Sequence, residues 1–158
     1  MNIRVPLAMV ILVGLASGVS AQNPKATPFS LLLHATHSTV KVGSPVDVDL
    51  TTTNNLNRPI KLGKSNPGME YQIQVRDQQG QLVPSTVLYK QLQNPVYVFR
   101  LTTQILQPQQ SATEIFDIAM FFDLNKAGTY SIQLQRLLPQ ELGKGSVSSN
   151  TLVLTITP

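Results

Sequence analysis

The sequence predicts an all-β fold, a sandwich of seven or eight antiparallel strands. Apolar and polar residues alternate in short runs along most of the chain, and turn-forming residues separate these runs. No run has the period of a convincing amphipathic helix, although residues 118–124 are compatible with one helical turn. Short alternating runs with turns between them are typical of two packed β-sheets.

The first 21 residues have the order of features found in a secretory signal peptide. Arg4 supplies a positive charge, a mainly apolar stretch follows, and small residues lead up to Ala21. The stretch is too short and too rich in Gly and Ser for a good membrane span, so we expect cleavage near Ala21. Residues 22–28 then form a short leader, and one domain follows over residues 29–158. We therefore expect a secreted or periplasmic protein with no stable membrane anchor after cleavage.

The expected strands share one pattern, with apolar residues on one face and Thr, Gln, Ser or Asp on the other. The first strand is broken at Ser38. The predicted segments are 29–37 and 39–42, 46–53, 71–75, 97–101, 130–134 and 152–156.

The breaks between these segments carry residues that favour turns. Residues 43–45 separate the first strand from the second, and the Asn-rich stretch 54–59 ends the second. Residues 77–80 predict a hairpin turn in which Gly80 takes a positive φ. Residues 84–95, which begin and end with proline, are expected to be irregular and to lie at a sheet edge.

The segment from Leu124 to Ile132 resembles the tyrosine corner of immunoglobulin-like sandwiches. In that corner, a Tyr near the start of the penultimate strand bonds through its hydroxyl to backbone a few residues upstream. Gly128 and Tyr130 are the expected corner residues here. The chain lacks the Cys and Trp of antibody domains, so the resemblance is to bacterial secreted immunoglobulin-like or fibronectin-like β-sandwich domains. It implies an immunoglobulin-like antiparallel sandwich.

Four features follow one another along residues 46–136. They are the Asn-rich break before Ile60, a strand that ends in the Gly80 turn, a Leu-x-Pro sequence at 106–108, and the Gly-x-Tyr corner. This order is similar, more loosely, to that of the bacterial intracellular proteinase-inhibitor family. Gln109 stands where that pattern usually has Gly, and a signal peptide conflicts with an intracellular role. The resemblance implies the sandwich and leaves protease inhibition as an alternative function.

Composition excludes several classes of function. The absence of cysteine excludes thiol catalysis, cysteine zinc sites and disulfide staples. The formal net charge is +4, but the basic residues are scattered along the chain and form no cluster. Nucleic-acid binding requires a concentrated basic face, so we expect no nucleic-acid partner.

The candidate metal ligands and catalytic residues are few. His34 and His37 are three residues apart, so an extended strand points them to opposite faces. Asp47 and Asp49 share one strand face, and Asp123 begins an Asp-x-Asn fragment without the Glu that completes a calcium loop. No Gly-x-Ser-x-Gly elbow or Gly-rich phosphate loop is present. We therefore expect no metal, no cofactor and no enzyme activity.

The aromatic residues are the candidates for partner binding. We predict that Tyr89, Tyr97, Phe121 and Phe122 bind a partner, with core packing of the two phenylalanines through a helical turn as the alternative. The preferred interpretation is a non-catalytic binding protein with a protein or glycan partner outside the cytoplasm. One alternative is a protease inhibitor that presents residues 65–69 or 138–146 as its reactive loop. The other is a structural subunit that assembles through sheet edges.

Overall fold

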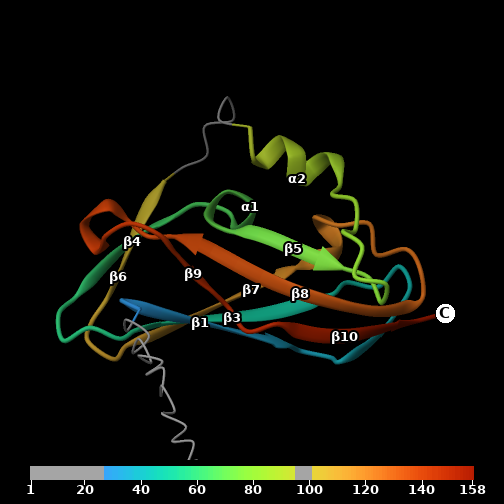
Figure 1. Cartoon of the computed structure of the whole chain (residues 1–158), viewed down its shortest axis with the longest axis horizontal. Coiled ribbons are helices and arrows are strands. Elements are labelled where there is room, and N and C mark those ends of the chain that lie inside the picture. The colour runs from blue at the N-terminus through green and yellow to red at the C-terminus, as the bar shows by residue number, and fades with distance from the viewer. Residues whose placement is uncertain (1–26, 95–100) are drawn as a thin grey trace, which may run out of the picture.

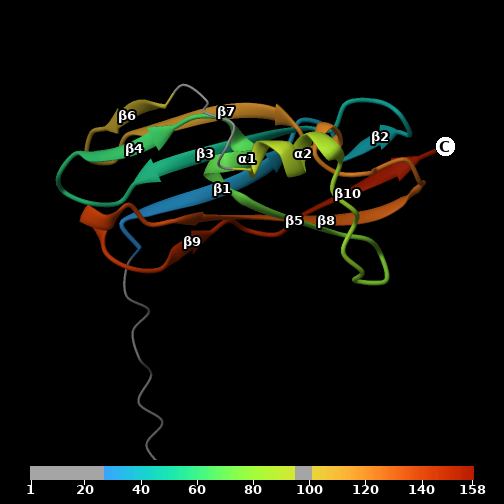
Figure 2. The same cartoon turned by 90° about the horizontal axis from the view of Figure 1, so that it is seen from above.

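The computed structural model describes residues 27–94 and 101–158, and these form an immunoglobulin-like β-sandwich (Figures 1 and 2). The first layer has the strand order β1-β3-β7, and both pairings are antiparallel. Its strands are β1 (Phe29–Ala35), β3 (Asp47–Asn54) and β7 (Ser111–Asp117). A separate two-stranded ribbon consists of β4 (Ile60–Lys64) and β6 (Thr102–Leu106).

The second layer has the strand order β2-β10-β8-β5, and β9 pairs with β8 off this path. Its strands are β2 (Thr39–Lys41), β5 (Gln72–Arg76), β8 (Gly128–Leu137), β9 (Ser146–Ser148) and β10 (Leu152–Thr157). Every pairing in this layer is antiparallel except that of β2 with β10. The helical elements are α1 (Pro67–Glu70), α2 (Val87–Leu92) and the 3₁₀ turns η1 (Ile118–Met120) and η2 (Gln140–Leu142).

The predicted break at Ser38 is confirmed, and it has a topological consequence. β1 pairs with β3 in the first layer, whereas β2 runs parallel to β10 in the second. The amide of Thr155 donates to the carbonyl of Ser38 at 2.9 Å, so the break itself is held against the last strand. The first strand therefore belongs to both layers.

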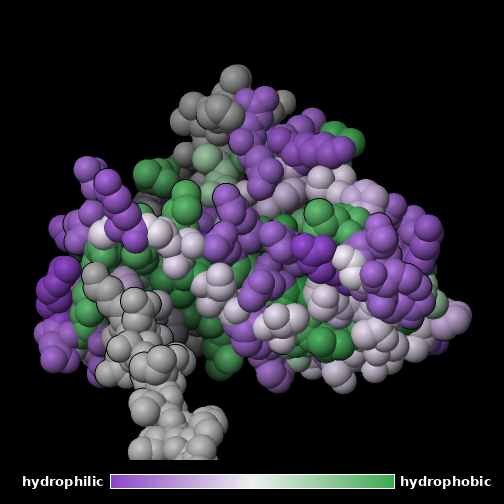
Figure 3. Space-filling view, in the orientation of Figure 1, coloured by the Kyte–Doolittle hydropathy of each residue, from purple (hydrophilic) through white to green (hydrophobic). Residues whose placement is uncertain are grey.

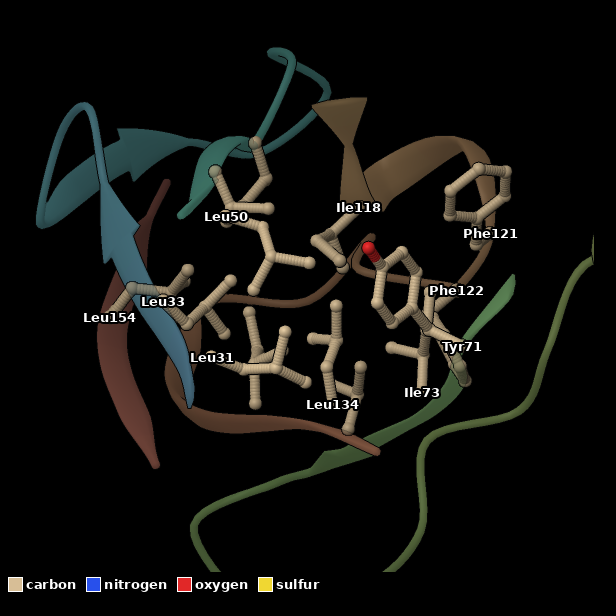
Figure 4. Packing of buried hydrophobic residues seen from close by; sticks show 14 of the residues in the cluster. Leu31, Leu33, Leu50, Tyr71, Ile73, Ile118, Phe121, Phe122, Leu134 and Leu154 are labelled. Carbon is tan, nitrogen blue, oxygen red and sulfur yellow. The ribbon is translucent and has the colours of Figure 1, made fainter. Parts of the chain in front are cut away.

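The core consists of the inward-facing residues of both layers, and Figure 4 shows how they interdigitate. The burial pattern of β1 alternates strictly, and that of β8 places every second side chain from Tyr130 onward in the interior. Leu50, Ile132 and Leu134 are fully buried, with no exposed surface. Since apolar burial contributes about 25 cal/mol per Å², this interior compensates for the absence of disulfides.

The structure contains more strands than the seven or eight predicted. β6, β7 and β9 were not assigned from the sequence, and β7 was missed because polar Thr and Glu residues occupy both of its faces. The stretch after Pro84 contains the helix α2, which begins where the Thr86 hydroxyl accepts from the amide of Tyr89 at 3.3 Å. The predicted turns are confirmed: Gly80 has φ 76°, and η1 supplies the helical turn after Asp117. The predicted signal peptide, most of the leader and most of the predicted strand 97–101 lie outside the described residues.

Asn54 explains why the second strand ends in an Asn-rich break. It is fully buried, and its Nδ2 donates to the carbonyls of Arg58, Leu106 and Gln107 at 2.9 to 3.0 Å. Its Oδ1 accepts from the amide of Leu56 at 2.9 Å. One side chain thus satisfies the backbone groups where β3 passes into β4 and β6 passes into β7.

Candidate interaction site

A groove of about 700 Å³ lies between α1 and the end of β8, and it is here called the α1 groove. It is bounded by Gly63 and Ser65 at the end of β4, by Met69 of α1, by Leu101, and by residues 135–139. Figure 3 shows hydrophobic surface exposed in this region, beside α1 and the tip of β8. The groove is therefore a junction of α1, the second layer and the β4-β6 ribbon.

The rim of the α1 groove is apolar. The exposed fractions are 74% for Leu101, 66% for Leu137 and 44% for Met69. These three side chains come from segments far apart in the sequence but converge on one opening. Exposed apolar side chains are common singly, whereas their convergence on a concave surface is typical of a binding site.

The floor of the α1 groove is a partly buried ionic network, in which the side chains of Lys64 and Glu114 are 21% and 25% exposed. Glu70 Oε2 lies 3.1 Å from Lys64 Nζ and 3.4 Å from a guanidinium nitrogen of Arg136. Lys64 also pairs with Glu114 of β7, and the Tyr71 hydroxyl donates to Glu114 Oε1 at 2.6 Å. Two cations and two carboxylates thus neutralise one another.

Arg136 connects this network to the sheet. It is 6% exposed, and its guanidinium donates to the Tyr71 hydroxyl at 3.0 Å and to the carbonyl of Gly63. The guanidinium also lies 5.2 Å from the centre of the Tyr71 ring. Burial raises the pKa of the Tyr71 hydroxyl well above its ordinary value, the Arg136 charge lowers it in part, and Glu114 raises it further. The hydroxyl therefore stays protonated and donates to the Glu114 carboxylate.

The network also fixes α1 in place. The amide of Ser65 donates to Glu70 Oε1, and the side chain of Asn66 caps the helix by accepting from the amide of Met69 at 3.1 Å. Because Glu70 is held by Lys64 and Arg136 as well, the short helix is tied to β4 and β8. We infer that the groove is formed before any ligand arrives, and that its floor carries no uncompensated charge.

One strand edge opens into the groove. β5 begins at Gln72, opposite Gln135, so β8 extends two residues beyond its partner on that side. The amide of Leu138 donates to the carbonyl of Gly145, which shows that even-numbered residues here bond toward β9. The amide and carbonyl of Leu137 therefore face the groove, where no strand of the described residues pairs with them.

The structure corrects the prediction that aromatic residues bind a partner. Tyr89, Phe121 and Phe122 are each 5% exposed, so they present no surface to another molecule. The Tyr89 ring lies 5.7 Å from that of Phe121 and 5.1 Å from that of Phe122, between centres. The turn η1 allows both adjacent phenylalanines to point inward, as the alternative interpretation had it. Tyr97, the remaining candidate, lies outside the described residues.

Tyr130 and Gly128 lie at the start of β8, away from the groove. The Tyr130 hydroxyl donates to the carbonyl of Lys126, four residues upstream, at 2.9 Å. This is the backbone hydrogen bond that a tyrosine corner requires. Gly128 has φ 157°, a region that residues with a Cβ rarely adopt.

The candidate metal ligands and reactive loops are placed as follows. His34 lies opposite Asp49 on the outer face of the first layer, and His37 lies beyond the end of β1. Within the described residues, no three His, Asp or Glu side chains are grouped so as to hold a metal ion. Residues 65–69 include most of α1, and residues 138–146 contain η2, so each segment includes a helical turn. No helix among the described residues is long and apolar enough to cross a membrane.

Sequence reasoning did not identify the residues that form the groove. Arg136 carried a usable signal, because it occupies the next inward position after Tyr130, Ile132 and Leu134 in an alternating strand. A charged residue at an inward position predicts a buried partner. Glu70 and Glu114 carried no such signal, because they come from a helical turn and from a strand that the pattern did not reveal.

Comparison with known proteins yields only a distant structural likeness. No protein-family model matches the chain, and no curated protein matches it. Among solved structures, 32 chains match. One is the CARDB domain of the PF1109 protein from Pyrococcus furiosus, solved in complex with di-metal ions, which is 13% identical. The alignment covers 81% of this chain and 91% of that domain, with a TM-score of 0.44, and such a distant likeness transfers no function.

Proposed function

We propose that this chain is a non-catalytic binding protein that takes an extended, apolar segment of a protein partner into the α1 groove. The observation that carries the proposal is the combination of an apolar rim with a charge-neutral, preformed floor. Preorganisation lowers the entropic cost of binding. The outward-facing backbone of Leu137 adds a donor and an acceptor for an extended segment, as in recognition by strand addition.

The same geometry supports binding rather than catalysis. The ionisable groups in the floor are committed to one another, and the Tyr71 hydroxyl is held protonated by its burial. A general acid or base needs a pKa near the working pH and access to the reacting atom. The Tyr71 hydroxyl meets neither condition, because the residue is 2% exposed and its pKa is raised.

The proposed place of action is outside the cytoplasm, in the periplasm or the medium. The order of charge, apolar stretch and small residues before Ala21 supports export. Expression of the full chain in its native organism, followed by fractionation and N-terminal sequencing, tests this. We expect a processed form that begins at Gln22. Recovery of the unprocessed chain in the cytoplasm would contradict it.

Protease inhibition is less well supported by the geometry. An inhibitory loop must present extended backbone to the protease, whereas residues 65–69 and 138–146 contain helical turns. The backbone hydrogen bonds of those turns are internal, as between the amide of Leu142 and the carbonyl of Pro139 at 2.8 Å. Binding in the groove requires no such loop.

Site-directed photo-cross-linking tests the proposed groove. A photoreactive residue replaces Leu137 at the rim in one variant and Val153, 57% exposed on β10, in a matched control. Both full-length variants are expressed in the native organism and irradiated there. We expect one dominant protein adduct at position 137 and none at position 153. Equal labelling at both positions would contradict the proposed groove. Labelling of no protein at position 137 would also contradict the proposal, and it would favour a glycan or small ligand.

The captured partner then permits a quantitative test. Leu137→Glu places a charge on the apolar rim, and Val153→Glu introduces the same charge elsewhere. We expect Leu137→Glu to weaken binding by at least about tenfold, and Val153→Glu to leave it within about twofold. Equal affinities of the two variants would show that the partner binds outside the groove.

A further inference from the structure

The β7 edge of the first layer is an open strand edge. The amide of Asn54 donates to the carbonyl of Gln110, and the amide of Ile118 donates to the carbonyl of Val46, each at 3.0 Å. These two bonds lie just beyond the two ends of β7. They show that the even-numbered residues of β7 bond toward β3. The amides and carbonyls of Ser111, Thr113, Ile115 and Asp117 therefore face away from β3. No strand of the described residues pairs with that side, which forms a rim in Figure 2.

This edge has few of the features that normally keep an open strand from pairing. Residues 111–117 contain no Lys, Arg or Pro. The Glu114 carboxylate is bound to Lys64 and Tyr71, and Asp117 Oδ1 accepts from the amides of Val46 and Ala119 at 2.7 and 2.9 Å. Neither carboxylate has to leave water for a strand to dock, and Ile115 is 67% exposed beside the edge.

The other edges of the two layers are shorter or covered. The amide and carbonyl of Leu33 on β1 are bound by the side chain of Asn150 at 2.7 and 2.9 Å. On β5, the carbonyl of Val75 accepts from Val83 at 2.9 Å, and the amide of Ile73 donates to the Tyr89 hydroxyl at 3.1 Å. β2 has only three residues. β7 is thus the long edge that the described part of the chain leaves uncovered.

We propose that the β7 edge pairs antiparallel with the β7 edge of a second copy of this chain, which joins two β1-β3-β7 sheets into one. An antiparallel pair of identical strands is self-complementary about a two-fold axis, which is the symmetry of most homodimers. A charged edge would repel its own copy, whereas the carboxylates of this edge are already bound within each copy. This pairing is independent of the α1 groove.

The exposed isoleucine selects the register of this pairing. An axis at Ile115 places the two Ile115 side chains opposite each other and Thr113 opposite Asp117 of the second copy. An axis at Glu114 would instead place Ile115 opposite Thr113, so that the two isoleucine side chains would not meet. We therefore assign the axis to Ile115, where apolar surface is buried.

Sedimentation of the protein purified from cells that express the full chain tests the dimer. We expect a concentration-dependent shift from monomer to dimer. Thr113→Pro removes an outward amide without breaking the β3 ladder, and Ile115→Lys places a charge at the axis. Each should raise the dissociation constant at least about tenfold. Leu32→Lys, on the same sheet face but 59% exposed on β1, is the matched control and should dimerise normally.

Cysteine cross-linking tests the register, because the natural chain has no cysteine. With the axis at Ile115, the two Cα atoms at that position lie about 5.5 Å apart, within disulfide range. The two Thr113 positions lie about 13 Å apart. Ile115→Cys should therefore form an intermolecular disulfide, and Thr113→Cys should not.

Three results would overturn the proposal. They are a monomer at all concentrations up to about 1 mM, a dimer that survives both Thr113→Pro and Ile115→Lys, and disulfide formation at position 113 in preference to 115. Circular dichroism establishes that each variant is folded before it is scored. The Leu137→Glu variant should dimerise normally. Loss of partner binding tests the groove and loss of dimerisation tests the β7 edge, so failure of one proposal is distinguishable from failure of the other.

Discussion

The two edges of the first layer carry similar strands but differ in what covers them. β1 and β7 each have seven residues, and each pairs with β3. On β1, the side chain of Asn150 supplies both a donor and an acceptor to Leu33, much as a neighbouring strand would. On β7, the outward backbone groups meet no strand of the described residues. The β1 edge is thus capped at Leu33 by a single amide side chain, whereas the described residues supply no such cap to β7.

This difference shows that strand content alone does not determine whether a sheet assembles. Both edges expose one large aliphatic side chain on the outer face, Leu32 on β1 and Ile115 on β7. What separates them is the satisfaction of backbone groups, since unpaired amides and carbonyls are the template for strand addition. The comparison leads to four mutational or pH tests, from the largest expected effect to the smallest.

The largest effect is expected at the end of β3, on which both edges depend. Asn54→Leu removes the side chain that bonds Leu56, Arg58, Leu106 and Gln107, and it leaves the buried carbonyl of Leu106 and three partly buried backbone groups without this partner. We expect the free energy of unfolding to fall by about 3 kcal/mol, as measured by urea denaturation. A loss below about 1 kcal/mol would show that water replaces these bonds.

The second test concerns how stability depends on pH. It involves the Tyr71 hydroxyl, which donates to Glu114 on the inward face of β7. The raised pKa of Tyr71 means that its hydroxyl stays protonated when folded, whereas the unfolded chain ionises near pH 10. Its contribution to stability is therefore complete below about pH 10 and declines as the pH rises toward the folded pKa. Between about pH 10 and the folded pKa, we expect this residue alone to lower the free energy of unfolding by about 1.4 kcal/mol per pH unit.

Tyr71→Phe provides the control for this pH dependence. The variant should be less stable at neutral pH, because it loses the hydrogen bonds to Glu114 and Arg136. It should also lose stability less steeply above pH 10. Burial raises the pKa of Tyr89 and Tyr130 too, so a residual slope is expected in the variant. Identical slopes in the two proteins would contradict the role assigned to Tyr71.

The third test opens the closed edge. Asn150→Ala removes both hydrogen bonds to Leu33, and because the site is partly solvated we expect a loss of about 1 kcal/mol. The more informative measurement is light scattering. If backbone satisfaction decides the difference between the edges, the variant should form assemblies larger than the dimer. Unchanged scattering would show that neighbouring elements close β1 without Asn150.

The smallest effect is expected from exposed aliphatic residues. Leu32→Lys and Ile115→Lys should each change the free energy of unfolding of the monomer by less than about 0.5 kcal/mol in urea titrations at low concentration. The two variants should therefore differ in association and not in stability. A larger loss for Ile115→Lys at low concentration would show that the isoleucine contributes to packing within the monomer.

Much of the fold was predictable because it depends on local alternation and turn residues. The alternating pattern located β1, β3, β5, β8 and β10, and the break at Ser38 followed from the sequence alone. β7 escaped because its inward positions include Glu114, whose burial becomes favourable only when Lys64 and Tyr71 arrive from elsewhere in the chain. The pattern of a single strand cannot reveal a partner that another segment supplies.

The candidate site was hardly predictable from sequence for the same reason. The α1 groove is formed by residues from β4, α1 and β8 together with Leu101, and no local motif joins them. Aromatic residues drew attention because they often mediate binding, yet here Tyr89, Phe121 and Phe122 fill the core. Arg136 at an inward position was an informative signal that the sequence analysis did not use, and it would have indicated the floor of the groove and not its rim.

The split first strand constrains when this protein is able to fold. β2 pairs with β10, so residues near the start of the domain depend on the last residues of the chain for their partner. The second layer therefore cannot be completed before β10 has been synthesised. Because pairing of residues so distant in the sequence is slow, we expect the docking of β2 on β10 to be a late step of folding.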